Sequence, residues 1–245
     1  MSEKNKKTIA CLADIHVQAS DEGKWRDFFQ DVSRQADVLL IGGDLTYAGK
    51  AAEAEVLASE LRSCGIPVAC VMGNHDYEAG EEDAIMAALR SEQVHVLDGE
   101  AVVLNGVGIA GIKGFGGGFD RYMMPMYGEQ INKDFVQETA SEALKLDQAL
   151  VKLSGEVEND RIVALMHYAP VKGTVVGEPE EIFPFLGSSR LADPLNRRKV
   201  AAAFHGHAHI GTLEGKTSEG VPVYNVAMHI LRKEGYTPPV FYYEL

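Results

Sequence analysis

The sequence predicts an α/β fold built around a mostly parallel sheet. Up to residue 90, short apolar runs of strand length alternate with longer segments whose apolar residues recur at helical spacing. The 245 residues are 46% hydrophobic, which is enough for a full core. No internal repeat, low-complexity tract or linker divides the chain. We therefore expect a single domain over residues 1–245, with right-handed crossovers between parallel strands.

The first part of the chain alternates strands with helices. Three apolar runs are bounded by turn residues, and they span residues 8–15, 37–41 and 67–72. Apolar residues lie on one helical face over residues 25–35, 51–64 and 81–90. Gly65 and Pro67 end the second of these helices. Strands that alternate with helices pair in parallel, because each helix carries the chain back across the sheet.

The pattern changes after residue 90. Short apolar runs separated by turn residues predict strands that pair more in antiparallel fashion, at residues 94–97, 101–104 and 107–112. A long amphipathic helix is expected over residues 135–153, followed by strands at 161–166, 200–204 and 240–245 and a hairpin within 211–227. Residues 113–130 contain five glycines and residues 168–198 contain four prolines, so neither segment is expected to form long regular elements. Long loops of this kind are usually functional or mobile.

Charge and cysteine content exclude several functions. The formal net charge of −13 argues against a duplex nucleic-acid surface, which needs clustered Lys and Arg. An acidic protein can still bind an anion where metal ions invert the local field. The polar segment 1–7 does not resemble a signal peptide, and no apolar run approaches the length of a membrane span. Three cysteines without CxxC spacing predict a reduced, cytoplasmic protein without disulfides; the oligomeric state is not indicated.

Side chains with oxygen or imidazole donors follow five of the expected strands. They are Asp14-x-His16, Gly43-Asp44, Gly73-Asn74-His75-Asp76, His167 and Gly206-His207-x-His209. Open α/β folds place their sites outside the carboxyl ends of the strands. Donors at i and i+2 of an extended segment point the same way, so the first and last motifs are expected to act as pairs. Mixed carboxylate, imidazole and amide donors suit Mn, Fe or Zn.

This series of motifs, in this order, resembles the signature of the calcineurin-like metallophosphoesterases. The matching positions run from Asp14 to His209 and so cover most of the chain. The compact chain and its Gly-Asn-His-Asp form are similar to the small bacterial class III cyclic nucleotide phosphodiesterases of that family. The resemblance implies a four-layer αββα sandwich, in which two mixed sheets are flanked by helices. The motif-bearing strands would then end at one edge of the sandwich.

The resemblance also implies a centre with two metal ions. The first ion would be held by Asp14, His16, Asp44 and His209. The second would be held by Asp44, Asn74, His167 and His207, so that Asp44 bridges the pair. Two such cations clamp a phosphoryl group and lower the pKa of a bridging water, whose hydroxide attacks phosphorus without a nucleophilic Ser or Cys. His75 would lie beside the metals as proton donor or transition-state stabiliser.

Other polar residues are open to two interpretations. Asp76 either orients His75 in catalysis or caps the next helix. Arg121, in the glycine-rich segment, either reaches a substrate phosphate or is merely solvated. Arg190 offers a guanidinium suited to phosphate, although Ser188 and Ser189 before it also suit a helix start. A strand-end structural role is expected for His205, and His95 and His229 are also interpreted as structural.

The predicted function is a dinuclear metal-dependent phosphoester hydrolase. A phosphodiesterase acting on small or nucleotide phosphate esters is favoured, and segments 113–130 and 168–198 would lie on the substrate side. The alternatives are a phosphomonoesterase or protein phosphatase of the same family, and a metal-binding scaffold without catalysis. A scaffold predicts a broken ligand set or a lost His75, and the sequence has neither.

Overall fold

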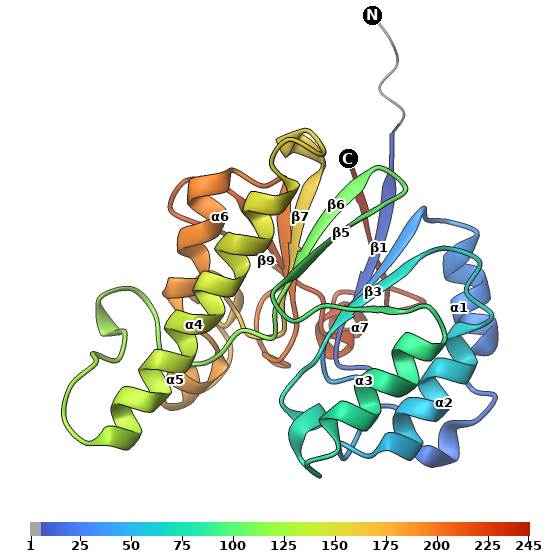
Figure 1. Cartoon of the computed structure of the whole chain (residues 1–245), viewed down its shortest axis with the longest axis horizontal. Helices are drawn as coiled ribbons and strands as arrows, with labels where there is room; N and C mark the ends of the chain where they lie inside the picture. The colour runs from blue at the N-terminus through green and yellow to red at the C-terminus, as the bar shows by residue number, and fades with distance from the viewer. Residues whose placement is uncertain (1–5) are drawn as a thin grey trace, which may run out of the picture.

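The computed structural model describes residues 6–245, in two sheets packed face to face (Figure 1). The expectation that segment 1–7 is not a signal peptide concerns residues that lie mostly outside this described range. The first sheet has the order β11-β1-β2-β3-β4, formed by Phe241–Glu244, Thr8–Leu12, Val38–Gly42, Val68–Val71 and His95–Val96. The second has the order β5-β6-β7-β8-β10-β9, formed by Glu100–Leu104, Val107–Gly111, Ile162–Leu165, Ala202–His205, Pro222–Asn225 and Glu214–Lys216.

Helices cover the outer faces of both sheets. On the first sheet lie α1 (Arg26–Ser33), α2 (Ala51–Leu61) and α3 (Glu82–Ser91), and on the second α4 (Gln130–Leu153) and α6 (Ala192–Arg198) (Figure 1). The short helices α5 (Phe183–Leu186) and α7 (Met228–Lys233) complete the set. The expected four-layer α/β sandwich of two mixed sheets is therefore confirmed. None of the described helices combines the length and apolar character needed to cross a lipid bilayer.

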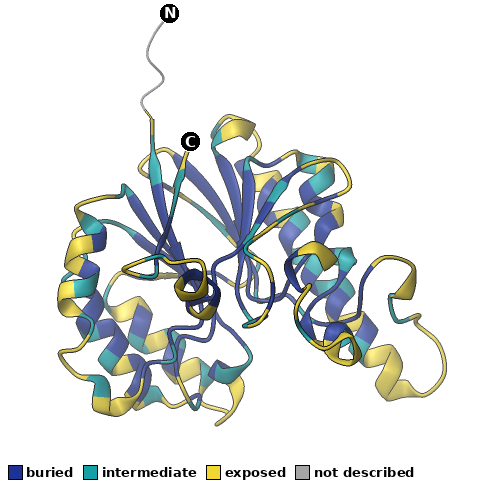
Figure 2. Ribbon diagram, turned by 180° about the vertical axis from the view of Figure 1, so that it is seen from behind, coloured by how far each residue is buried: buried dark blue, intermediate teal, exposed yellow. Residues whose placement is uncertain are grey.

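The central strands are buried on both faces (Figure 2), and their alternating side chains enter two separate layers of the hydrophobic core. In β7, Val163 and Leu165 face the first sheet, whereas Ile162 and Ala164 face α4. This alternation is the two-residue period of a strand that is covered on both faces. The inter-sheet cluster therefore draws side chains from both sheets. Burial on both faces explains why the parallel strands read as continuous apolar runs in the sequence.

Three elements differ from expectation. β4 pairs in parallel with β3 in the first sheet, because α3 returns the chain to that sheet as a crossover helix. Of the three strands expected to pair in antiparallel fashion in this region, β5 and β6 do so. α4 begins at Gln130 rather than at residue 135, since its exposed polar first turn carries no apolar periodicity. The segment 168–198 is less irregular than expected, because it contains α5 and α6.

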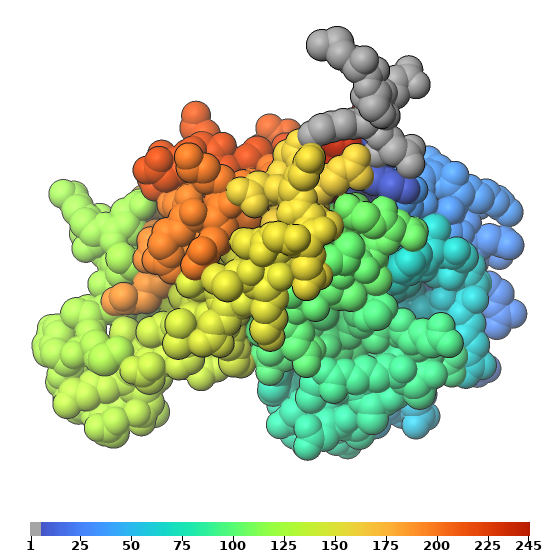
Figure 3. Space-filling view, turned by 45° about the horizontal axis from the view of Figure 1, so that its top comes forward, coloured from blue at the N-terminus to red at the C-terminus, as the bar shows by residue number. Residues whose placement is uncertain are grey.

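The two long loops lie on the same side of the molecule as the second sheet. In the space-filling view, the light-green chain around residue 125 stands out from the body near the orange segment that includes α6 (Figure 3). Within residues 113–129 the one helical turn is a short 3₁₀ helix, Asp120–Tyr122, which agrees with the expectation of no long regular element there. The bridge between Gly118 and Ser188 joins this segment to the segment 168–198.

Candidate metal centre

The carboxyl ends of five strands bring most of the candidate ligands together. Among the described residues, two groups of metal-ligating side chains form, and within each the ligand atoms lie within 4.8 Å of one another. The first group contains Asp14, His16, Asp44 and His209. The second contains Asp44, His167 and His207. Asn74 lies beside the second group, because its Oδ1 is 2.9 Å from His167 Nε2.

The spacing of the donor atoms fits one metal ion in each group. His209 Nε2 lies 3.0 Å from Asp14 Oδ1, and His167 Nε2 lies 3.4 Å from Asp44 Oδ1. His16 Nε2 lies 3.7 Å from Asp44 Oδ2. Two donors that share an ion through bonds of about 2.0–2.2 Å stand about 2.8–3.8 Å apart, depending on the bond angle. Asp44 thus presents one carboxylate oxygen to each group, which is the arrangement a bridging ligand needs.

The backbone places these donors through left-handed residues rather than through extended strand. Asp14, His16, Asp44 and His207 have φ values of 58°, 47°, 48° and 68°. Non-glycine residues rarely adopt this conformation, and strain of this kind gathers at functional sites. The extended geometry expected for these pairs is therefore wrong. Asp14 and His16 still share the first group, as expected, whereas His207 and His209 belong to different groups. Asp14 N donates to Gly43 O at 3.0 Å, which fastens the first loop to the second.

Hydrogen bonds to backbone carbonyls orient two of the histidines. His167 Nδ1 donates to Gly42 O at 2.9 Å, which leaves Nε2 as the nitrogen that faces Asp44. His207 Nε2 donates to Phe185 O at 3.1 Å, which leaves Nδ1 free. Ligating histidines are commonly held in this way, since the second bond fixes the ring and its tautomer.

Burial sets the charge of the candidate ligands. It lowers the pKa of His207 to about 3 and that of His16 to about 4, so both rings are neutral near pH 7. Burial alone would raise the pKa of Asp14, but the hydrogen bond from His209 and the neighbouring imidazoles bring it to about 2. Burial raises the pKa of Asp44. Neutral imidazole and ionised carboxylate are the forms that bind metal.

Two glycines leave room for the carboxylates. A Cβ on Gly73 would overlap the backbone and carboxylate of Asp44, and a Cβ on Gly206 would overlap the carboxylate of Asp14. Gly43 has a φ of +88°, a left-handed conformation that glycine adopts without steric cost. At Gly73 and Gly206 the requirement is close approach and not a special turn.

A sequence model of the calcineurin-like phosphoesterases matches residues 7–211. The chain belongs to the calcineurin-like phosphoesterase family. The protein TT1561 of Thermus thermophilus is 15% identical, with a TM-score of 0.57 over 92% of this chain and 91% of that one. Another crystal structure is 13% identical, with a TM-score of 0.63 over 98% and 95% of the two chains. A search of curated proteins found no match. These likenesses in structure show a shared fold.

Replacing Gly73 by Ala in this phosphoesterase is expected to lower the metal content of both groups. The new Cβ would push the Asp44 carboxylate out of position, and overpacking costs about 1–3 kcal/mol of stability. Metal analysis and urea unfolding of the purified variant measure the two effects. Gly65→Ala is the matched control, because its Cβ would meet only Ser33, at 3.8 Å. A Gly73→Ala protein with a full metal complement would contradict the expectation.

His75 borders the first group without belonging to it. Its Nδ1 donates to Tyr47 O at 3.0 Å and lies 3.4 Å from a carboxylate oxygen of Glu78. Its ring meets that of His16 edge to face, with centroids 4.7 Å apart. The backbone N of His75 donates to Asp44 Oδ1 at 2.9 Å. The side chain is 38% exposed, so the ring is partly accessible at the edge of the centre.

Asp76 holds two loops of the phosphoesterase together. Its buried carboxylate accepts hydrogen bonds from Leu45 N, Thr46 N, Thr46 Oγ1 and Gly73 N, at 3.2, 2.8, 2.6 and 2.7 Å. None of these bonds involves the His75 ring or the start of α3. These contacts are those of a positioning residue and do not include a cap of α3, and the catalytic role of Asp76 stays a prediction.

Asp76→Ala is expected to destabilise the fold by at least about 3 kcal/mol. The change leaves several buried N–H donors without a partner, and each unsatisfied group costs about 1–3 kcal/mol. Urea unfolding would show a lower midpoint. The exposed Asp83→Ala protein serves as control and should stay within about 0.5 kcal/mol of the parent. Equal stability of the two variants would refute this role of Asp76.

The two arginines predicted to bind substrate lie outside both metal groups. Arg121 is exposed, and it donates to the Tyr122 hydroxyl at 2.7 Å. Arg190 is half-buried in a short 3₁₀ turn, and its backbone N donates to Ser188 Oγ, which caps the turn as the alternative interpretation had it. Neither guanidinium contacts a candidate ligand in the bonds described for it, so their substrate-binding roles stay predictions.

Sequence reasoning missed two rings of this centre. His229 in α7 stacks on His209, with centroids 4.5 Å apart and planes at 13°. Tyr168 packs against His207 at 4.4 Å. α7 is too short to give a periodic signal, and the bond from Met228 N to Ala13 O brings it to the site. His205 is structural as expected, since it is buried and bonded to Gly206 O and Thr174 Oγ1 at 2.8 Å each.

Proposed function

We propose that this phosphoesterase hydrolyses small phosphate diesters, nucleotide esters among them, with two metal ions. One ion is assigned to Asp14, His16, Asp44 and His209, and the other to Asp44, Asn74, His167 and His207. The observation that carries the proposal is the Asp44 carboxylate, which faces one group with Oδ1 and the other with Oδ2. The mixture of imidazole, carboxylate and amide donors suits Mn, Fe or Zn.

The metal ions, Asp44 and His75 are proposed to have different roles in the reaction. Bound metal ions would supply Lewis acidity towards the phosphoryl oxygens and a water of lowered pKa as the nucleophile. Asp44 places negative charge between the two cation sites and so reduces their mutual repulsion. His75 is held through Nδ1 by Tyr47 O, and its Nε2 would pass a proton to the leaving oxygen.

The chain is proposed to act as one domain in a reducing compartment such as the cytoplasm. A single inter-sheet cluster that includes Ile41 of β2 and Leu165 of β7 supports one folding unit. Cys11, Cys64 and Cys70 are all free, as expected of a protein in reducing surroundings.

A hydrolysis panel with metal-reconstituted protein tests the function. We expect higher kcat/KM on methyl p-nitrophenyl phosphate, a diester, than on p-nitrophenyl phosphate, a monoester, with both activities lost on chelation. A preference for the monoester would instead support a phosphomonoesterase or protein phosphatase. A protein that binds two ions and turns over neither substrate would be the non-catalytic scaffold.

A further inference from the structure

A cavity of about 310 Å³ lies between the two long loops of the second-sheet side. The first loop contributes Phe119 and Tyr122, and the second contributes Lys172, Glu180, Phe183 and Pro184. We propose that this aromatic cavity binds a flat, hydrogen-bonding ring of the phosphate ester, such as a nucleobase. This assignment names the substrate class of the proposed function and therefore rests on it. Ligand pockets start at about 300 Å³ and are mostly apolar with a few placed polar groups.

The aromatic cavity is joined to the candidate metal centre by packing. Phe119 and Phe183 belong to one buried apolar cluster with Ala208, the residue between the candidate ligands His207 and His209. Two residues beyond Phe183, the carbonyl of Phe185 accepts the hydrogen bond from His207 Nε2 at 3.1 Å. The wall of the cavity and a ring of the metal centre are therefore fixed by the same short helix. An ester held at the centre could extend one substituent towards this wall.

The walls of the cavity are suited to an aromatic ring. The Phe119 and Phe183 rings meet edge to face, with centroids 6.3 Å apart. Tyr122 is 69% exposed while it lines the cavity. Arg121 steadies it, since its Cζ lies 4.8 Å from the ring centroid and its guanidinium donates to the hydroxyl. Phe119 and Phe183 are buried and form the apolar wall, so Tyr122 is the ring on which a base would stack, and it accepts any base because every base has a π-face.

The two charged residues of the cavity favour a nucleobase over a plain hydrocarbon ring as its ligand. Lys172 and Glu180 line the cavity, and Lys172 Nζ lies 5.7 Å from the centroid of Phe183. Both residues are exposed, and a hydrocarbon ring beside them offers no hydrogen-bond partner to either group. The edge of a nucleobase carries donors and acceptors together and can satisfy an ammonium and a carboxylate at once.

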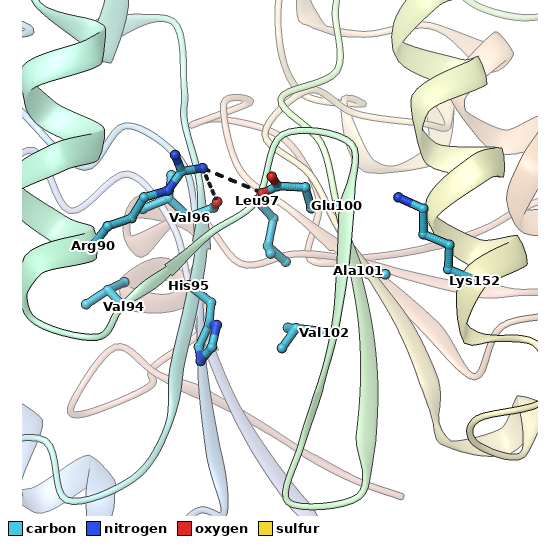
Figure 4. A pocket seen from close by; sticks show the side chains of 9 residues that line it. All are labelled: Arg90, Val94, His95, Val96, Leu97, Glu100, Ala101, Val102 and Lys152. Atoms are coloured by element: carbon cyan, nitrogen blue, oxygen red, sulfur yellow. Dashed lines mark hydrogen bonds and ion pairs between the residues drawn. The ribbon is translucent and has the colours of Figure 1, made fainter.

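A larger cavity of about 400 Å³ lies elsewhere, beside the edge strands β4 and β5 (Figure 4). Its Arg90 donates to Val96 O at 3.1 Å and lies 3.6 Å from Glu100. Neither cavity is lined by a residue of the metal groups, but the larger one also shares no residue with the apolar cluster that joins Phe119 and Phe183 to Ala208. The aromatic cavity is thus the better place for a substituent of the ester.

Calorimetry with AMP and ribose 5-phosphate on the metal-reconstituted protein tests the cavity, because the two probes differ only by the base. AMP is expected to bind about 5- to 150-fold more tightly, the range that one stacked base gives. Tyr122→Ala should bring this ratio close to one while the affinity for ribose 5-phosphate stays. Tyr127→Ala is the matched control, since Tyr127 is 71% exposed on the same loop and does not line the cavity.

The outcomes separate the cavity from the proposed function. Equal binding of the two probes by the parent protein, or an equal loss of the ratio in Tyr122→Ala and Tyr127→Ala, would overturn the cavity assignment. If methyl p-nitrophenyl phosphate is hydrolysed in that case, the proposed function survives alone. A base preference that depends on Tyr122 in a protein that hydrolyses no diester would support the cavity and refute the function.

Discussion

The Asp44→Asn protein is expected to lose both metal ions and at least about 10³-fold in activity. The Asp44 carboxylate faces His167 with Oδ1 and His16 with Oδ2, whereas asparagine offers one neutral oxygen in its place. Without the negative charge, two neighbouring cations would also repel each other more strongly. Metal ions supply several kcal/mol of transition-state stabilisation, and about 1.4 kcal/mol corresponds to a tenfold change in rate. Metal analysis and diester hydrolysis measure the two losses.

Two controls sharpen this experiment. His16→Gln removes a residue of the first group alone and should mainly weaken one ion. Asp31→Asn changes an exposed aspartate that pairs only with Arg34 in the described contacts, and it should retain two ions. If Asp44→Asn also retained two ions at full occupancy, Asp44 would not bridge them.

His75→Ala is expected to keep both ions and to lose about 10²- to 10⁴-fold in turnover, the usual range for general acid catalysis. The backbone bond from His75 N to Asp44 Oδ1 survives the change, so the metal groups should stay in place. The loss should be smaller for a p-nitrophenyl ester than for a nucleotide ester. Nitrophenolate leaves with little help from a proton, whereas a ribose alkoxide needs one.

The dependence on the leaving group is the decisive measurement for His75. Electrostatic stabilisation of the phosphoryl oxygens would depress both substrates alike. A uniform loss with both ions present would therefore replace the general-acid role and leave the hydrolase assignment standing. Joint loss of metal and activity would mean that His75 is itself a ligand. The exposed His95→Ala protein, altered in β4, should behave like the parent.

Local patterns were sufficient for the elements that carry the site. β1, β2 and β3 were found in the sequence because buried parallel strands are continuous apolar runs, and polar residues at their ends were visible at once. The two-sheet sandwich came from the resemblance, because no local signal says which strands share a sheet. β4 shows the limit, since its two residues join the first sheet through a crossover that spacing does not specify.

The geometry of the site was less accessible from the sequence. The bonds of Asp76 reach back to Thr46, thirty residues earlier, and such long-range contacts leave no mark on neighbouring residues. The left-handed backbone of Asp14 and His207 is likewise set by tertiary bonds rather than by residue type. The stacking of His229 on His209 depends on where a six-residue helix docks. The sequence therefore indicates which residues form the site, whereas the orientation of their side chains depends on the tertiary structure.

Each proposed ion would be held from both sheets. The first takes Asp14 and Asp44 from one sheet and His209 from the other, and the second combines Asp44 with His167 and His207. Loaded ions would then act as cross-links across the seam of the sandwich, so that the two halves could separate only as metal leaves. A ligand that binds only the closed state raises the free energy of opening by mass action. Amide hydrogen exchange in β2 and β7 should consequently slow together on loading and quicken together on chelation.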